Sequence, residues 1–184
     1  LEDLDMQVSD MLGSLQGQLK LAVESSAKYF VPHLFAAFKR QHPEVNLQLT
    51  VVNRAQAIRR LSDNRDDLVI MSMVPQDMGL EFLPFLNNPI VAVVPADHPL
   101  CDRGPLHLQD LEPYTLLMRE QGSGTRMACE EYFKEKRVHF SQTLEVASNE
   151  SQRECAVAGL GVALLTRHAV SLELATGLLR ELPV

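Results

Sequence analysis

The sequence predicts an α/β fold divided into two lobes, and two observations lead to this prediction. Segments in which apolar and polar residues alternate are separated by segments of helical periodicity, an order that is typical of a parallel sheet with crossover helices. A polar, proline-rich stretch, ADHPLCDRGP at 96–105, then interrupts the chain. We interpret this stretch as the passage into a second lobe.

The expected first lobe follows a helical segment at the start of the chain. Apolar residues recur at helical spacing from Leu1 to Leu15, which predicts either a terminal helix on the core or the end of a longer dimerising helix. The next segments predict strand, helix, strand, short helix and strand, and then two further strands. In chain order they are GQLKLAV, KYFVPHLFAAFKRQHP, NLQLTVV, the stretch through Ile58 and Leu61, LVIM, LEFLPFL (80–86) and NNPIVAVVP (87–95).

The expected second lobe repeats the alternation of strands and helices. YTLLM predicts a strand, the GSGTR turn leads into a helix, and TLEVAS predicts the next strand. A helix over 149–159, the strand VALLT, a helix over 167–177 and the segment LLREL complete the chain.

Composition favours a packed chain and argues against several partners. Of the 184 residues, 46% are hydrophobic, so disorder is not expected. A formal net charge of −7, from 17 basic and 24 acidic residues, disfavours contact with DNA phosphates or an anionic membrane. No apolar run approaches the roughly 20 residues of a membrane span. The three cysteines are far apart, so we expect reduced thiols in the cytoplasm and no disulfide framework or metal site.

Catalytic motifs are missing from the sequence. It has no G-x-S-x-G elbow, no HExxH and no Walker loop. The histidines that do not precede a proline are scattered along the chain. These observations favour a binding protein over an enzyme. The solute-binding protein of a transporter and a small-molecule enzyme on the same fold remain alternatives.

Small polar residues at four strand-to-helix junctions predict a site for a carboxylate or a phosphate. Ligands of open α/β sheets bind beyond the carboxyl ends of the strands, where helix N-termini present free amide groups. Arg126 or Arg119 could clamp the anion, but Arg126 could instead pair with Glu130, and Arg119 could be solvated. Each junction could also be an ordinary helix cap. The four junctions are Ser25-Ser26, Asn53-Arg54, Ser123-Gly124-Thr125 and Ser148-Asn149, and Ser72 could reach the same site.

Several segments, in this order, resemble the effector-binding domain of LysR-type transcriptional regulators. They are GQLKLAV, FVPHLFAAFKRQHPEVNLQL, DDLVIM, VVPADHPL, GSGTR and SNESQRECAVAGLGVALLTRHAV. Within that family, SAKYFVP, LMREQGSGTR, SNES and VSLELATG are most similar to the regulators of carbon-fixation (Rubisco) operons. Ser72-Met73 departs from the pattern, because a Gly-Arg pair is expected there.

The resemblance implies two Rossmann-like lobes with an interlobe cleft, similar to type 2 periplasmic binding proteins. Residues 1–16 would end a linker helix, 18–95 plus 166–184 would form lobe I, and 96–165 would form lobe II. A small anionic metabolite would bind between the lobes, without catalysis, metal or cofactor. The candidate contacts that the resemblance implies are Ser25, Ser26, Asn53, Ser72, Gly122, Ser123, Thr125, Arg126 and Asn149. The resemblance further implies a homodimer, a tetramer at full length, and DNA binding only through an N-terminal winged helix-turn-helix domain that this chain does not include.

Overall fold

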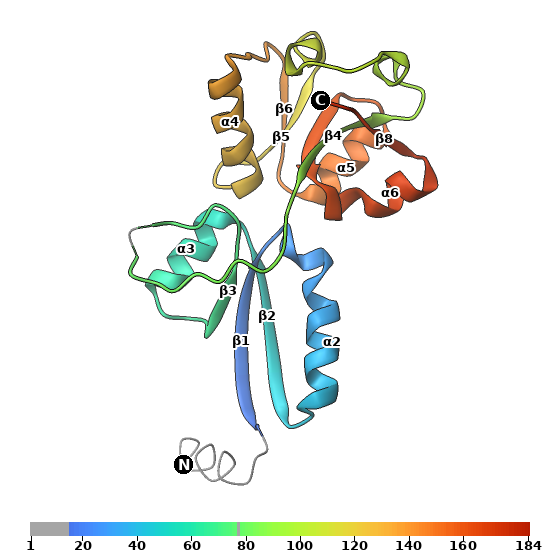
Figure 1. Cartoon of the computed structure of the whole chain (residues 1–184). Coiled ribbons are helices and arrows are strands. Elements are labelled where there is room, and N and C mark those ends of the chain that lie inside the picture. Colours follow the sequence, from blue (N-terminus) through green and yellow to red (C-terminus); the bar gives the residue numbers. More distant parts are fainter. Residues whose placement is uncertain (1–14, 77) are drawn as a thin grey trace. The chain divides into compact units, whose positions relative to one another are not determined.

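The chain divides into two compact units in the computed structural model, which describes residues 15–76 and 78–184. The first unit ends at Ser72 and the second begins at Met73. Each unit has its own sheet with helices beside it, so the predicted α/β class with two lobes is confirmed (Figure 1). The helical segment expected over residues 1–16 lies outside the described residues as far as residue 14, and residues 15 and 16 are not helical.

The first unit is the parallel β-α-β-α-β arrangement that the sequence predicts. Its three strands are all parallel and lie in the order β2-β1-β3. The elements are β1 (Gly17–Glu24), the 3-10 turn η1 (Ala27–Tyr29), α2 (Val31–Gln41), β2 (Val45–Val52), α3 (Arg54–Ser62) and β3 (Leu68–Ile70).

A small apolar core holds this unit together. Leu21 and Val23 of the central strand pack with Ala27 and Val31, and all four side chains are buried. Proline lies in the first turn of α2, where its missing N–H costs no helical hydrogen bond. The core therefore lies near the carboxyl end of β1, the end at which the candidate residues of this unit are found.

The second unit is larger and has a mixed sheet. Its strand order is β6-β5-β7-β4-β8; β5 is parallel to β6 and β7, whereas β4 is antiparallel to β7 and β8. The strands are β4 (Ile90–Pro95), β5 (Leu116–Arg119), β6 (Thr143–Val146), β7 (Val162–Thr166) and β8 (Leu179–Glu181). The helices and turns are η2 (Pro99–Asp102), η3 (Leu108–Leu111), α4 (Gly124–Lys136), α5 (Asn149–Val157), η4 (Arg167–Val170) and α6 (Ser171–Thr176).

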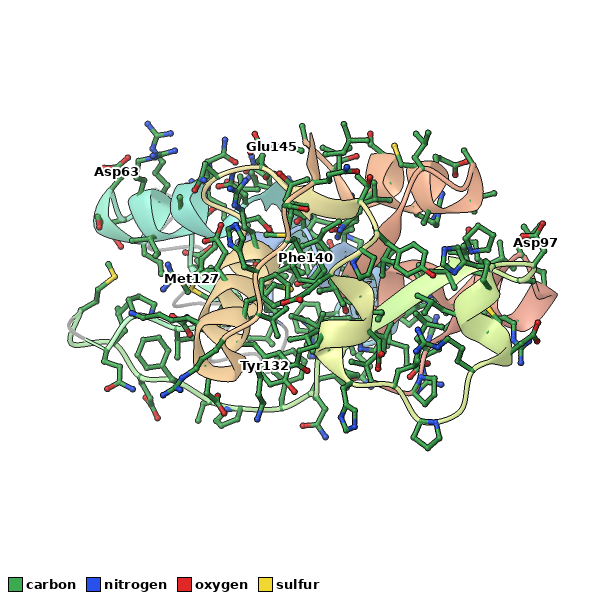
Figure 2. The ribbon with its side chains drawn as sticks, turned by 90° about the horizontal axis from the view of Figure 1, so that it is seen from above. Asp63, Asp97, Met127, Tyr132, Phe140 and Glu145 are labelled. Carbon is green, nitrogen blue, oxygen red and sulfur yellow. The ribbon has the colours of Figure 1, made fainter. Side chains whose placement is uncertain are left out.

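The core of this unit lies between the sheet and the elements that cover it. Phe133 of α4 is buried against Phe140, with ring centroids 5.0 Å apart, and Figure 2 shows Phe140 beside that helix. Such pairs of aromatic rings stabilise a core beyond the area they bury. Both rings belong to the same buried cluster as Leu116 of β5 and Leu164 of β7, which fixes α4 on the sheet, and with it the turn at which the helix begins.

Three expectations about the chain differ from the structure. Residues 80–86 form no strand: no described strand pairs with them, and Leu83 and Phe85 are 77% and 58% exposed. Strands β4 and β8 were expected in lobe I, but both lie in the sheet of the second unit, where the antiparallel ladder to β7 places them. The expected helix over 167–177 is a 3-10 turn followed by the short α6.

Candidate anion-binding site

The candidate residues gather in two groups, one in each unit. Parallel strands end at the same edge of a sheet. In the first unit the register pairs Glu24 with Val52, and the residues that follow the three strand ends are Ser25, Ser26, Asn53 and Ser72. In the second unit the register pairs Arg119 with Val146 at the ends of β5 and β6. The residues that follow those ends are Gly122, Ser123, Thr125, Arg126 and Asn149.

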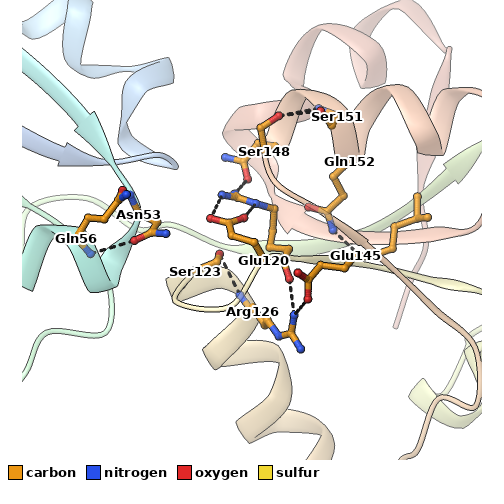
Figure 3. Close-up of polar contacts among 12 residues, drawn as sticks. Asn53, Gln56, Glu120, Ser123, Arg126, Glu145, Ser148, Ser151 and Gln152 are labelled. Atoms are coloured by element: carbon orange, nitrogen blue, oxygen red, sulfur yellow. Dashed lines mark hydrogen bonds and ion pairs between the residues drawn. The ribbon is translucent and has the colours of Figure 1, made fainter.

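Asn53 caps α3 in the first unit. Its Oδ1 accepts a hydrogen bond from the amide of Gln56 at 3.0 Å, and Gln56 Oε1 accepts one from the amide of Asn53 at 3.0 Å (Figure 3). This is a reciprocal capping box, so the ordinary-cap interpretation of this junction is confirmed. Contact of Asn53 with a ligand stays a prediction.

A buried carboxylate that the sequence analysis missed also lies at this edge. Glu24, the last residue of β1, is 2% exposed, and its Oε2 accepts hydrogen bonds from the amide and the hydroxyl of Ser72 at 2.8 and 2.7 Å. The two residues are 48 positions apart, so no local pattern could have joined them. The candidate hydroxyl of Ser72 thus faces a carboxylate of its own unit.

The GSGTR turn forms the start of α4. Gly122 has a φ of 86°, a left-handed conformation that glycine adopts without steric cost. Ser123 is the N-cap: its Oγ accepts a hydrogen bond from the amide of Arg126 at 3.4 Å. Ser123 and Thr125 are only 4% and 5% exposed. The first-turn amides and these two hydroxyls therefore lie together at the positive end of a helix of 13 residues.

Arg119 joins this turn to α5. The residue is 3% exposed, so the interpretation of Arg119 as a solvated side chain is wrong. Its Nε donates to Glu120 Oε2 at 2.8 Å, its Nη2 donates to Glu120 Oε1 at 3.1 Å, and its Nη1 donates to Asn149 Oδ1. Asn149 itself is fully buried in the first turn of α5. One guanidinium thus links the end of β5 to the first turn of α5, the helix that follows the neighbouring strand β6.

Arg126 lies on the other side of the same turn. Its Nε donates to Glu130 at 2.7 Å. Its Nη1 donates to the carbonyl oxygen of Arg119 at 2.8 Å and to Glu145 at 2.5 Å, and Figure 3 shows Arg126 beside Glu145. Burial alone would lower the pKa of Arg126, but the bonds to Glu130 and Glu145 raise it above the usual value. The expected pair with Glu130 is confirmed, and contact of Arg126 with an anion stays a prediction.

The N-terminus of α5 is capped by Ser148 rather than by Asn149. Ser148 Oγ accepts a hydrogen bond from the amide of Ser151 at 3.0 Å, which leaves the side chain of Asn149 to meet Arg119. One turn further along, the fully buried Gln152 donates to the carbonyl oxygens of Leu117 and Leu164 at 2.6 and 3.1 Å. Sequence analysis missed Gln152. Its spacing of three residues from Asn149 is the only local indication that both face the sheet.

The arrangement suits binding more than covalent chemistry. Burial raises the pKa of the Cys129 thiol to about 12, so that thiol is not a nucleophile at neutral pH. Among the described residues, no cluster of three or more histidine, cysteine or acidic side chains could hold a metal ion. Two pockets of the second unit, of about 670 and 320 Å³, are lined by other residues than the candidates. No helix within the described part of the chain has the length and hydropathy of a membrane span.

The chain belongs to the family described as the LysR substrate binding domain, which matches residues 12–184. The HTH-type transcriptional activator CmpR of Synechocystis sp. is 37% identical over 184 residues, which cover all of this chain and 60% of the activator. The HTH-type transcriptional regulator CbbR of Rhodospirillum rubrum is 39% identical over 184 residues, covering 99% of this chain and 60% of that protein. The chain therefore spans about 60% of the length of these curated relatives.

A solved structure agrees with this assignment. The regulatory domain of Synechocystis PCC6803 CcmR, in complex with 2-PG (2-phosphoglycolate), has a TM-score of 0.86 and 37% sequence identity, and the match covers 91% of this chain and 81% of that domain. The family resemblance found in the sequence is confirmed, and so is its closeness to the Rubisco operon regulators, one of which, from Allochromatium vinosum, is 35% identical over 184 residues. Neither the transporter alternative nor the enzyme alternative finds support in these relatives.

Proposed function

We propose that this chain senses a small anionic metabolite for a LysR-type transcriptional regulator of the carbon-fixation group. The observation that carries the proposal lies in the second unit. Helices α4 and α5 each follow one of two adjacent parallel strands, β5 and β6, and the buried guanidinium of Arg119, at the end of β5, is bonded to Asn149 in the first turn of α5. Helix N-termini attract phosphates and carboxylates through their free amides and the helix dipole.

In the proposed complex, each candidate residue of the second unit has a defined task. The amides of the GSGTR turn and the hydroxyls of Ser123 and Thr125 donate hydrogen bonds to the charged group of the effector. Gly122 permits the close approach of the backbone, since it carries no side chain. The side-chain amide of Asn149 would donate a further hydrogen bond to the effector, and the positive charge of Arg126 would attract it. Charge-assisted bonds of this kind are about twice as strong as neutral ones.

The first unit would contribute Ser25, Ser26, Asn53 and Ser72 from the opposite side of an interlobe cleft. Because Ser72 faces the buried carboxylate of Glu24, and because no arginine follows it, this side is a poor place for a second phosphate. We therefore infer an effector with one phosphate, or with carboxylates alone. 2-Phosphoglycolate, the ligand of the CcmR domain, has this character and is the first compound to test.

Binding would act on transcription through a difference in affinity between two arrangements of the lobes. A coupling of about 1–3 kcal/mol is typical of such systems, and two or three charge-assisted bonds formed in one arrangement supply it. The proposal includes a cytoplasmic protein without catalytic activity, which dimerises through this domain, forms tetramers at full length, and contacts DNA through a separate N-terminal winged helix-turn-helix domain.

Thermal unfolding with and without 2-phosphoglycolate tests the proposal. At a hundredfold excess over Kd, a ligand stabilises the folded state by about 2.7 kcal/mol. For a chain of this size this raises Tm by about 5–10 °C. The double variant Ser123→Ala/Thr125→Ala removes both hydroxyls and should abolish the rise.

The matched control is Ser141→Ala/Thr143→Ala, which has the same residue types and spacing at exposed positions. It should keep the full rise in Tm. Equal ligand-induced shifts in the two double variants would reject the GSGTR turn as the binding site. If sulfate and inorganic phosphate also shift the Tm of both double variants equally, the turn binds no anion at all.

A further inference from the structure

The guanidinium of Arg119 presents its two-pronged edge to a carboxylate of its own chain. Nε and Nη2 donate to the two oxygens of Glu120, at 2.8 and 3.1 Å, while Nη1 donates to Asn149 (Figure 3). This parallel, two-bond geometry is the one by which arginine also binds the carboxylate or phosphate of a ligand. Glu120 therefore occupies the edge of Arg119 that is best suited to a bound anion.

The two partners differ in their access to solvent. The side chain of Arg119 is 2% exposed, whereas that of Glu120 is 21% exposed. An unpaired buried arginine would be costly, so Glu120 keeps the guanidinium neutralised in the absence of a ligand. Because Glu120 is partly exposed, its side chain has room to rotate toward solvent without unpacking the core.

Glu120 also places a negative charge beside the start of α4. The carbonyl oxygen of Glu120 accepts the amide of Ser123, so the carboxylate belongs to the same turn as the amides proposed to bind the effector. At this short range a carboxylate repels an incoming anion, and partial burial limits the screening by water and salt.

We propose that Glu120 is an internal counter-ion that competes with the effector for the Nε–Nη2 edge of Arg119 and thereby weakens the binding of anions. This inference rests on the proposed function, because it assumes an anion at the GSGTR turn. Glu120 is thus a positioning residue that sets affinity without contributing a favourable contact to the ligand. Removal of its charge should strengthen binding, whereas removal of a contact residue should weaken it.

Three variants of the chain test this role by calorimetric titration with 2-phosphoglycolate. Glu120→Gln keeps the shape and removes the charge, and we expect Kd to fall about tenfold, which corresponds to about 1.4 kcal/mol. Glu120→Asp keeps the charge on a shorter side chain and should stay within about threefold of the unmodified chain. Glu131→Gln changes the net charge equally at an exposed position of α4, and its effect should be less than about twofold.

Stability without ligand provides a second measurement. Loss of the counter-ion leaves Arg119 less well neutralised, so Glu120→Gln should have a lower Tm than the unmodified chain and a larger rise in Tm on addition of 2-phosphoglycolate. If Glu120→Gln binds 2-phosphoglycolate with a Kd equal to or higher than that of the unmodified chain, the counter-ion role is overturned and the binding site is unaffected. If neither the unmodified chain nor Glu120→Gln binds 2-phosphoglycolate, sulfate or inorganic phosphate, the proposed function and this inference are overturned together.

Discussion

Gly161, directly before β7, should be intolerant of any side chain, because the backbone of Thr115, directly before the neighbouring strand β5, lies against it. A Cβ at this position would lie 2.2 Å from the carbonyl oxygen of Thr115, 3.0 Å from its carbonyl carbon and 3.2 Å from its Cβ. Ordinary contacts of a Cβ begin near 3.4 Å. The two strands would have to separate by about 1 Å to accommodate alanine, since backbone cannot rotate away as a flexible side chain can.

The cost follows from what that separation breaks. The amide of Val162 donates to the carbonyl oxygen of Thr115 at 2.9 Å, and at about 1 Å longer this hydrogen bond would be lost, at about 1 kcal/mol. Overpacking strain adds about 1–3 kcal/mol. The reduced freedom of the unfolded chain offsets about 0.4–1 kcal/mol of this. Gly161→Ala should therefore lower the free energy of unfolding by about 1–3.5 kcal/mol.

Urea unfolding followed by far-UV circular dichroism measures this change, and the absence of tryptophan makes a fluorescence probe less suitable. Gly104→Ala is the control, because a Cβ there meets nothing within 4 Å. We expect Gly104→Ala to be neutral or to stabilise by up to about 1 kcal/mol. The reasoning fails if the two variants differ by less than about 0.5 kcal/mol.

Two predictions concern titrating groups. Burial raises the pKa of the Cys129 thiol to about 12, so only about one thiol in ten thousand is ionised at pH 8. Iodoacetamide at this pH should therefore label Cys129 far more slowly in the folded chain than in the urea-unfolded chain, as measured by peptide mass spectrometry. Equal rates would contradict the burial of this thiol. Burial lowers the pKa of His98, against an opposing effect of Asp97, and His98 Nδ1 accepts the amide of Leu100 at 3.2 Å. The unfolded state therefore takes up a proton more readily than the folded state, so the contribution of neutral His98 to stability is fully present above the unfolded pKa of about 6.5 and is lost as the pH falls below it. Between pH 7.5 and pH 5.5, the free energy of unfolding in urea should fall more for the unmodified chain than for His98→Asn, because asparagine can still accept the amide of Leu100 but does not titrate. An equal fall would contradict the lowered pKa of His98.

Local patterns were sufficient to predict most of the elements. Apolar alternation located β1 and β2, and short apolar segments located β5 and β7, whose residues are all buried. Pro32 and the junction residue Asn53 placed the starts of α2 and α3 correctly, since helix termini have strong local requirements. The strand expected over residues 80–86 is wrong, because this segment is rich in apolar residues but no described strand supplies a partner. An apolar segment indicates what a strand would bury and leaves open whether a neighbouring strand exists.

The polar framework of the site could not be predicted in this way, because its partners are distant in sequence. Ser72 meets Glu24 across 48 residues, and Arg119 meets Asn149 across 30. A single sequence reveals such pairs only after the sheet order is known, since the order decides which strand ends are neighbours. The division between the units at Ser72 was missed for the same reason. The sequence alone places β4 with the strands of the first lobe, and only its antiparallel pairing with β7 assigns it to the second unit.

The bonds around the end of β5 affect how binding experiments on this domain should be interpreted. Gln152 holds β5 through the carbonyl oxygen of Leu117, Arg126 holds it through that of Arg119, and the side chain of Arg119 fixes the start of α5. None of these bonds requires a ligand, so this half of the proposed site is preformed, and preformed sites lose little entropy on binding. A substitution of Gln152 would displace the strand end and weaken binding without any contact to the effector. Loss of affinity alone therefore cannot identify a contact residue here. The hydroxyls of Ser123 and Thr125 give a cleaner test, because their removal leaves all three bonds in place.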